Sequence, residues 1–114
     1  MRVLISGTIA LQSLKRDEAL SGAREYILDA RTEPGCLAYN WSPDLNDDCT
    51  ICVFGEWESQ YLLDQHFNAH SHNSYRNMVS YLEQYQITHV TIAKYLVQNK
   101  APVYNDKQQP TAYF

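Results

Sequence analysis

Residues 50–59 constrain the fold of this chain more than any other stretch, because their chemistry changes from strand-like to helix-like within a few positions. Positions 50–54 are rich in β-branched and aromatic side chains, which favour a strand. Ser59 follows directly after Glu56-Trp57-Glu58, and serine is a common cap for the first turn of a helix. The stretch therefore predicts a strand over 50–57 and a helix that starts at Ser59.

A helix end followed by another strand lies one strand earlier. Pro34 cannot continue a helix, and Gly35 supplies the turn. Tyr39 and Trp41 then stand at alternate positions, which is the spacing of one face of a strand. We therefore expect a helix to stop before Pro34 and a strand to follow over 36–41.

The whole chain alternates strands with helices in the order βαββαβ. The expected elements are strands over 3–11, 36–41, 50–57 and 87–97, a helix before Pro34, and two short helices over 59–67 and 71–84. This order predicts a ferredoxin-like α+β fold, in which four antiparallel strands carry helices on one face.

The strands are apolar on both faces. Ile51, Val53 and Trp57 share one face of their strand, while Cys52 and Phe54 take the other. Strand 87–97 is apolar on both sides in the same way. Because helices cover one face only, the second face needs a partner, and face-to-face pairing of two sheets in a homodimer supplies it.

The length of 114 residues allows one domain, which we place at residues 1–97, followed by a polar tail at 98–114. Disorder is the default for such a tail. Val103, Tyr104, Tyr113 and Phe114 are more apolar than a solvated tail requires, so docking on its own subunit or on the partner stays open.

Charge and composition exclude several classes of partner. The formal net charge of −4 argues against nucleic acid and anionic membranes, which need a basic face. No apolar run approaches the roughly 20 residues of a membrane span. The N-terminus lacks a cleavage site and is interpreted as a first strand rather than a signal peptide.

The cysteines favour a reduced, cytoplasmic protein. Cys36, Cys49 and Cys52 make an odd count, which disfavours a disulfide framework. Cys49 and Cys52 have the spacing of a CxxC motif, but on a strand residues three apart point to opposite faces. Small buried apolar residues are the favoured interpretation of all three.

A family resemblance over roughly residues 2–97 depends on two runs of sequence. They are Glu33-Pro34-Gly35-Cys36-Leu37-Ala38-Tyr39, and Glu56-Trp57-Glu58-Ser59 with His66 after it. In this order and at this distance they resemble the antibiotic biosynthesis monooxygenase family, which is quinol-monooxygenase-like and belongs to the dimeric α+β barrel superfamily. The resemblance implies a homodimer that oxidises a small phenol, quinol or polyketide-like aromatic with dioxygen. It also implies that no metal, flavin or haem cofactor is used.

The resemblance makes Trp57 and His66 the candidate catalytic residues. Trp57 matches a family tryptophan at the end of the third strand, where it either lines the cavity or serves as a core aromatic. His66 matches a frequent family histidine. It either accepts a phenolic proton, because imidazole exchanges protons near neutral pH, or ties helix to sheet as a structural residue.

Six further residues are candidates for substrate binding. Tyr39 and Tyr75 would be cavity walls with hydroxyl groups, Asn40 an amide donor and Arg76 a cation for a phenolate, although a solvated surface arginine is an alternative. Val53 and Leu63 stand where the anthrone-oxidising branch has an asparagine and a tyrosine, which weakens that activity.

Two alternative sites are disfavoured. The haem-degrading branch has a tryptophan where this chain has His66 and a histidine where it has Arg76, so haem degradation is not expected. His66 and His70 have the four-residue spacing of helical zinc ligands, and His72 lies close by. A helix break is expected between them, and no carboxylate or thiol completes a triad, so no metal site is predicted.

Two other functions remain open on the same scaffold. One is a non-catalytic dimer that binds a small molecule in the same cavity. The other is an isomerase or cyclase, since fold does not fix chemistry. A buried polar group that faces the cavity would favour an enzyme over a binding protein.

Overall fold

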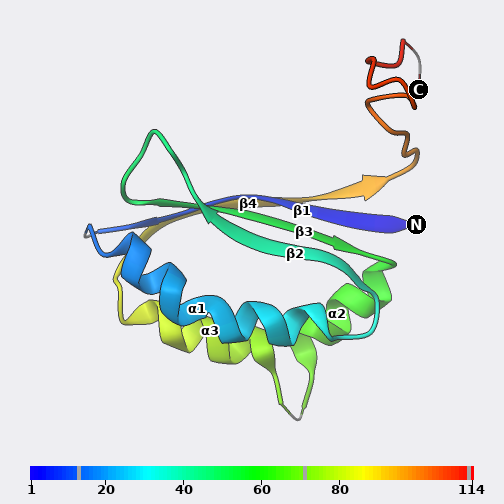
Figure 1. Ribbon diagram of the computed structural model, residues 1–114. Coiled ribbons are helices and arrows are strands. Elements are labelled where there is room, and N and C mark those ends of the chain that lie inside the picture. The colour runs from blue at the N-terminus through cyan, green and yellow to red at the C-terminus, as the bar shows by residue number, and fades with distance from the viewer. Residues whose placement is uncertain (13, 71, 113) are drawn as a thin grey trace.

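The computed structural model describes residues 1–12, 14–70, 72–112 and 114, and it has the predicted ferredoxin-like α+β architecture. The elements are β1 (Arg2–Leu11), α1 (Arg16–Arg31), β2 (Cys36–Pro43), β3 (Thr50–Trp57), α2 (Gln60–Asn68), α3 (Ser74–Glu83) and β4 (Ile87–Val97). The sheet has the order β2-β3-β1-β4, and all neighbours are antiparallel. The helices lie together on one face of the sheet (Figure 1).

The third helix begins later than the sequence pattern indicates. Its expected start, Ser71, lies outside the described residues, and α3 begins at Ser74. Asn73 explains this start, because its side-chain oxygen accepts a hydrogen bond from the backbone N–H of Arg76 at 2.8 Å. Ser59 caps α2 in the same way, by accepting from the N–H of Leu62 at 3.2 Å.

Small residues let α1 pack closely against its neighbours. Ala19, Ala23 and Ala30 are fully buried on its inner side. A Cβ at Gly22 would lie 2.1 Å from the hydroxyl oxygen of Tyr81, whose hydroxyl donates to the backbone oxygen of Ala19 at 2.9 Å. Tyr81 therefore joins α3 to α1 across the surface of the sheet.

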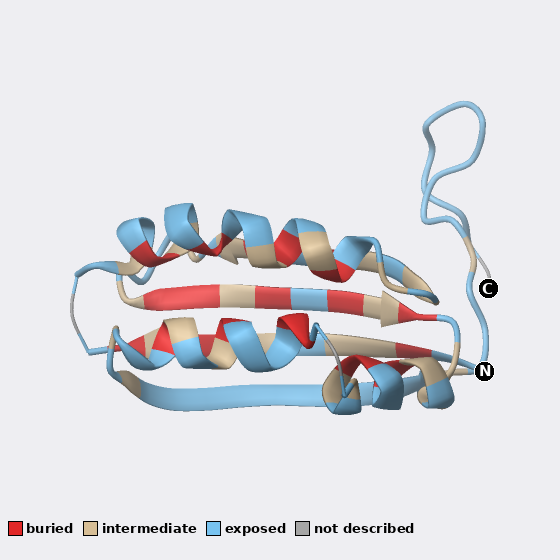
Figure 2. Ribbon diagram, turned by 90° about the horizontal axis from the view of Figure 1, so that it is seen from below, coloured by how far each residue is buried: buried red, intermediate tan, exposed pale blue. Residues whose placement is uncertain are grey.

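The two faces of the sheet differ sharply in exposure. Ile51 and Trp57, which face the helices, are 0% and 1% exposed, whereas Phe54 on the other face is 40% exposed. Edge strand β4 is exposed along almost its whole length (Figure 2). Apolar surface on the second face and on β4 is thus left uncovered within one chain.

The tail leaves the sheet after β4 and stands on the side away from the helices (Figure 1). It folds back on itself through a β-bridge between Tyr104 and Pro110, and the N–H of Thr111 donates to the oxygen of Val103 at 2.7 Å. Val103 and Tyr104 stay exposed, and Tyr113 lies outside the described residues. The division into a domain at 1–97 and a docking tail remains a prediction.

In the described part of the chain, no helix is long and apolar enough to cross a membrane.

Candidate functional site

A cavity of about 570 Å³ lies between the inner face of the sheet and the helices α2 and α3, a volume suited to a small ligand. Its walls are mostly apolar and aromatic. The residues that line it from the sheet include Ile5, Tyr39, Trp41, Val53, Trp57, Ile92 and Lys94, and those from the helices include Leu63, His66, Tyr75 and Met78.

His66 is the buried polar residue at the centre of the aromatic wall. It is 4% exposed and lines the cavity from α2. Its ring centroid lies 4.7 Å from that of Trp57 and 5.7 Å from those of Tyr39 and Tyr75. These rings hold the imidazole in one orientation, so a ligand in the cavity would meet a fixed nitrogen.

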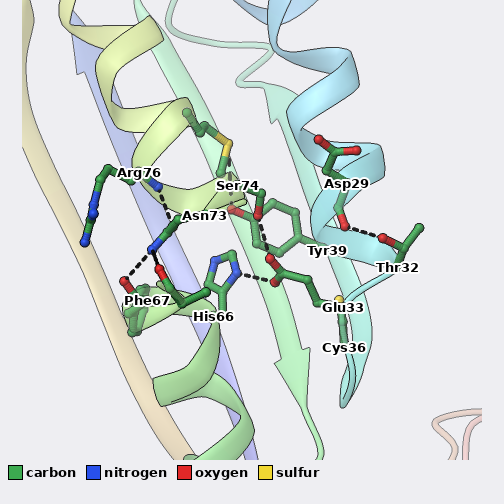
Figure 3. A network of polar contacts seen from close by, with 12 residues as sticks. Asp29, Thr32, Glu33, Cys36, Tyr39, His66, Phe67, Asn73, Ser74 and Arg76 are labelled. Carbon is green, nitrogen blue, oxygen red and sulfur yellow. Dashed lines mark hydrogen bonds and ion pairs between the residues drawn. The ribbon is translucent and has the colours of Figure 1, made fainter. Parts of the chain in front are cut away.

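Glu33 contacts Nδ1 of this imidazole. Its Oε2 lies 2.5 Å from Nδ1 of His66, and its Oε1 accepts a hydrogen bond from the Ser74 hydroxyl at 2.7 Å. Figure 3 shows the three side chains converging from the α1–β2 connection, α2 and α3. The carboxylate thus has a partner on each oxygen.

The contact determines which nitrogen can act as a base. A carboxylate accepts hydrogen bonds, so Nδ1 of His66 carries the proton, and Nε2 of the neutral ring has a free lone pair. None of the described residues forms a hydrogen bond with Nε2. This carboxylate–imidazole arrangement is the one that orients histidine bases in enzymes.

The α1–β2 turn places Glu33 at this point. Gly35 has φ +84, a left-handed conformation that glycine adopts without strain, and a Cβ there would lie 2.4 Å from Cδ1 of Leu62. The backbone N–H of Glu58 donates to the oxygen of Gly35 at 2.8 Å. The turn is thereby joined to the β3–α2 junction, which brings Glu33 beside His66.

Tyr39 is a neutral hydroxyl group in the cavity wall. Burial raises the pKa of its phenol, and the negative charge of Glu33 raises it further. Its hydroxyl donates to Sδ of Met78 at 3.8 Å. Tyr39 is therefore a hydrogen-bond donor rather than a base.

Most of the residues that the sequence indicated meet at this cavity. Tyr39, Val53, Trp57, Leu63, His66 and Tyr75 all line it. Asn40 does not, because it is exposed and its Oδ1 accepts from Nη2 of Arg31 at 3.3 Å. Arg76 is also exposed and is not a lining residue.

Sequence reasoning missed the residues that support His66. Glu33 belongs to the run that carries the family resemblance, but nothing in that run indicates that its side chain turns toward α2. Ser74 gives no local signal, whereas the apolar stripe of its helix does place Met78 on the inner side. Lys94 at the cavity follows from strand register, since it pairs with Ile5 on the helix-covered face.

No metal centre is present among the residues that the structure describes, where no three histidines, cysteines or acidic residues are close enough to hold an ion. Helix α2 ends at Asn68, before His70, and Nε2 of exposed His72 lies 3.3 Å from Oδ2 of Asp29. The three cysteines are free thiols.

Comparison with known proteins identifies the family. A model of the family described as antibiotic biosynthesis monooxygenase matches residues 3–78, about two thirds of the chain. The chain belongs to the antibiotic biosynthesis monooxygenase family. A curated relative, an uncharacterised protein of Synechocystis sp., is 29% identical over 67 residues, which are 59% of this chain and 46% of that protein. The match thus spans less than half of that relative.

Solved structures agree in fold. An antibiotic biosynthesis monooxygenase is 24% identical with a TM-score of 0.68, over 90% of this chain and 100% of its own. A candidate family member from Deinococcus radiodurans is 20% identical with a TM-score of 0.69, over 90% and 99%. Another from Nitrosomonas europaea is 10% identical with a TM-score of 0.73, over 85% and 90%. At these identities the similarity establishes the fold alone.

Proposed function

We propose that this protein is a homodimeric monooxygenase that oxidises a small phenolic, quinol or polyketide-like aromatic with dioxygen, without a metal or flavin. One observation carries the proposal: His66 is buried in the wall of an aromatic cavity, with Nδ1 held by the half-buried Glu33 behind it and Nε2 free to take a proton. A wall made of Trp57 and Tyr75 suits a flat aromatic ring. Family membership supports the reaction type.

The reaction begins with proton transfer from the substrate hydroxyl to Nε2 of His66. Glu33 stabilises the imidazolium that forms, because its carboxylate accepts the hydrogen bond from Nδ1. The deprotonated aromatic then supplies electrons to dioxygen. One oxygen atom enters the product and the other leaves as water, with two substrate hydrogens. All four electrons that dioxygen takes come from the substrate, so no external reductant is needed.

The dimer completes the fold in this proposal. Phe54 is exposed on the face of the sheet that the helices leave bare, and Tyr95 on β4 is 53% exposed. A second copy packed against this face would remove that apolar surface from water. Most residues that line the cavity belong to the opposite, helix-covered face, so dimer formation would leave this wall in place.

Oxygen uptake tests the proposal. Purified protein is mixed with small quinols and phenols in an oxygen electrode, and His66→Ala is compared with wild type. Loss of a general base lowers rates roughly a hundred- to ten-thousand-fold, so the variant should consume oxygen at or near the uncatalysed rate. Trp57→Phe is the control, because it keeps an aromatic wall and should chiefly weaken substrate binding.

The other outcomes favour different functions. If quinols bind but no oxygen is consumed above background, the protein is a binding protein. If the aromatic is converted without oxygen uptake and His66→Ala stops the conversion, the same base serves an isomerase or cyclase. If His66→Ala folds and consumes oxygen at the wild-type rate, His66 is not the base.

A further inference from the structure

One wall of the cavity holds a hydrogen-bond donor that has no acceptor. Trp41 lines the cavity from β2 and is 9% exposed, and its indole Nε1 is buried without a partner among the described residues. Buried polar groups in folded proteins are nearly always hydrogen-bonded, because leaving one unpaired is destabilising. An unpaired indole N–H in a cavity wall therefore points to an acceptor supplied by a ligand.

A second donor stands beside it. Tyr39 is two residues earlier on β2, and both residues are on the helix-covered face, paired with Gly55 and Val53 of β3. The Tyr39 hydroxyl donates only to the Sδ of Met78 at 3.8 Å. A thioether sulfur is a weak acceptor on a flexible side chain, so an incoming oxygen can displace it.

The two donors lie within reach of each other. Tyr39 and Trp41 are two residues apart on β2, so their side chains leave the same face of the strand side by side. Both side chains are long, so the phenol hydroxyl and the indole N–H can reach a common position in the cavity. A single oxygen atom can then accept from both groups, because a carbonyl oxygen has two lone pairs.

We propose that Tyr39 and Trp41 form an oxygen-binding subsite, which takes a carbonyl or phenolate oxygen of the aromatic ligand. That the ligand is aromatic rests on the proposed function. The subsite adds the requirement that the ligand carry a second oxygen atom. The ligand oxygen replaces Met78 as the acceptor for Tyr39 and gives Trp41 its partner.

The subsite and His66 lie at different points of the same cavity. Side chains two residues apart on a strand are about 7 Å apart, and the Tyr39 ring is already 5.7 Å from that of His66. A ligand can therefore place a hydroxyl at His66 and another oxygen at Trp41, across one or two fused rings. As His66 removes the proton, negative charge spreads to the second oxygen, where two fixed donors stabilise it.

Two phenols with the same ring skeleton, titrated in the absence of dioxygen, test the subsite. 6-Hydroxy-1-tetralone has a hydroxyl and a carbonyl at opposite ends, whereas 5,6,7,8-tetrahydro-2-naphthol lacks the carbonyl. Calorimetric titration should give wild type an about threefold to tenfold preference for the tetralone, the range for the one hydrogen bond that Trp41 gains, since Tyr39 only exchanges its acceptor. Trp41→Phe should abolish this preference. Trp57→Phe is the matched control, and it should weaken the binding of both ligands but preserve the preference for the tetralone.

The indole signals give a second readout that does not depend on affinity. The chain has two tryptophans, so a ¹H–¹⁵N spectrum has two indole cross-peaks, which Trp41→Phe assigns. The Trp41 peak should move downfield with the tetralone and stay in place with the tetrahydronaphthol.

Three results would overturn the subsite. They are a preference for the tetralone that persists in Trp41→Phe, a Trp41 peak that does not shift when the tetralone binds, and no binding of either compound. Because the titrations exclude dioxygen, these results are independent of oxygen uptake. Equal binding of both compounds would refute the subsite and leave the role of His66 standing. Absence of oxygen uptake by wild type would refute the oxygenase and leave the binding result intact.

Discussion

On β3, Ile51 and Val53 point toward the helices and are buried, whereas Phe54 points to the opposite face and is 40% exposed. Both sets of side chains are apolar, so composition alone does not separate the two faces. The chain's own helices close the first face (Figure 2), whereas the described residues leave Phe54 on the other face 40% exposed. In the proposed function, the inner face serves folding and chemistry, and the outer face serves association with a second copy.

The cavity sharpens this difference. On the inner face, α2 and α3 leave a cavity beside Trp57, and His66 lines it with its imidazole held by Glu33. A buried ionisable group with a fixed partner in a cavity wall is a common mark of a functional site.

The inner face should dominate stability. Ile51→Ala removes a side chain that is 0% exposed and should lower the free energy of unfolding by about 2–5 kcal/mol, measured by urea denaturation. Tyr61→Ala is the control, because Tyr61 is 69% exposed on α2 and its loss should change stability by less than about 0.5 kcal/mol. Equal losses in the two variants would contradict the assignment of the core.

The outer face should control association. A lysine in place of Phe54 would bury a charge between two packed sheets, so Phe54→Lys should be monomeric in analytical ultracentrifugation at micromolar concentration. The same substitution at exposed Tyr61 should leave the dimer unchanged. A wild-type monomer, or a Phe54→Lys variant that remains dimeric, would rule out sheet-to-sheet packing.

Glu33 should act as a positioning residue for His66. Glu33→Gln keeps the shape of the side chain and removes its charge, so oxygen uptake should fall by up to about a hundredfold, mostly in kcat. Because Nδ1 loses its carboxylate, ¹⁵N spectra should also show a changed tautomer balance for the His66 ring. A variant that unfolds would show a structural role only, and normal activity with an unchanged tautomer would remove Glu33 from the mechanism.

The smallest expected effect is the contribution of Tyr39 to stability at alkaline pH. Because burial raises the pKa of Tyr39 above its unfolded value, the unfolded chain loses the phenolic proton first. The stability that this group contributes is complete below about pH 10 and declines as the pH rises further. Tyr39→Phe should therefore lose less stability between pH 9 and about pH 11 than wild type, by urea denaturation at each pH. A steeper decline in the variant would contradict the burial of this phenol.

The fold could be predicted because its signals are local. Pro34 and Gly35 end a helix in any context, and Ser59 caps one, so the element order followed from short stretches of sequence. The start of α3 was missed because Asn73, rather than a residue near position 71, supplies the cap. The apolar outer face was also foreseen, since strand periodicity assigns Phe54 to it directly.

The site could be predicted only in part. His66 and Trp57 came from the family resemblance, but the partner of His66 depends on a contact between residues 33 positions apart. A tertiary contact of this kind has no periodicity or local spacing. For the same reason the unpaired indole of Trp41 gave no signal, because an absent hydrogen bond is visible only after the chain has packed.

The central claim is that this cavity inserts one atom of dioxygen into an aromatic substrate, and isotope labelling tests it most directly. The quinol that gives the fastest oxygen uptake is incubated with wild-type protein under ¹⁸O₂ in ordinary water. The mass of the product is then measured by mass spectrometry. The account predicts one ¹⁸O atom per product molecule, with label absent when His66→Ala is used. A product without ¹⁸O would contradict monooxygenation by this protein.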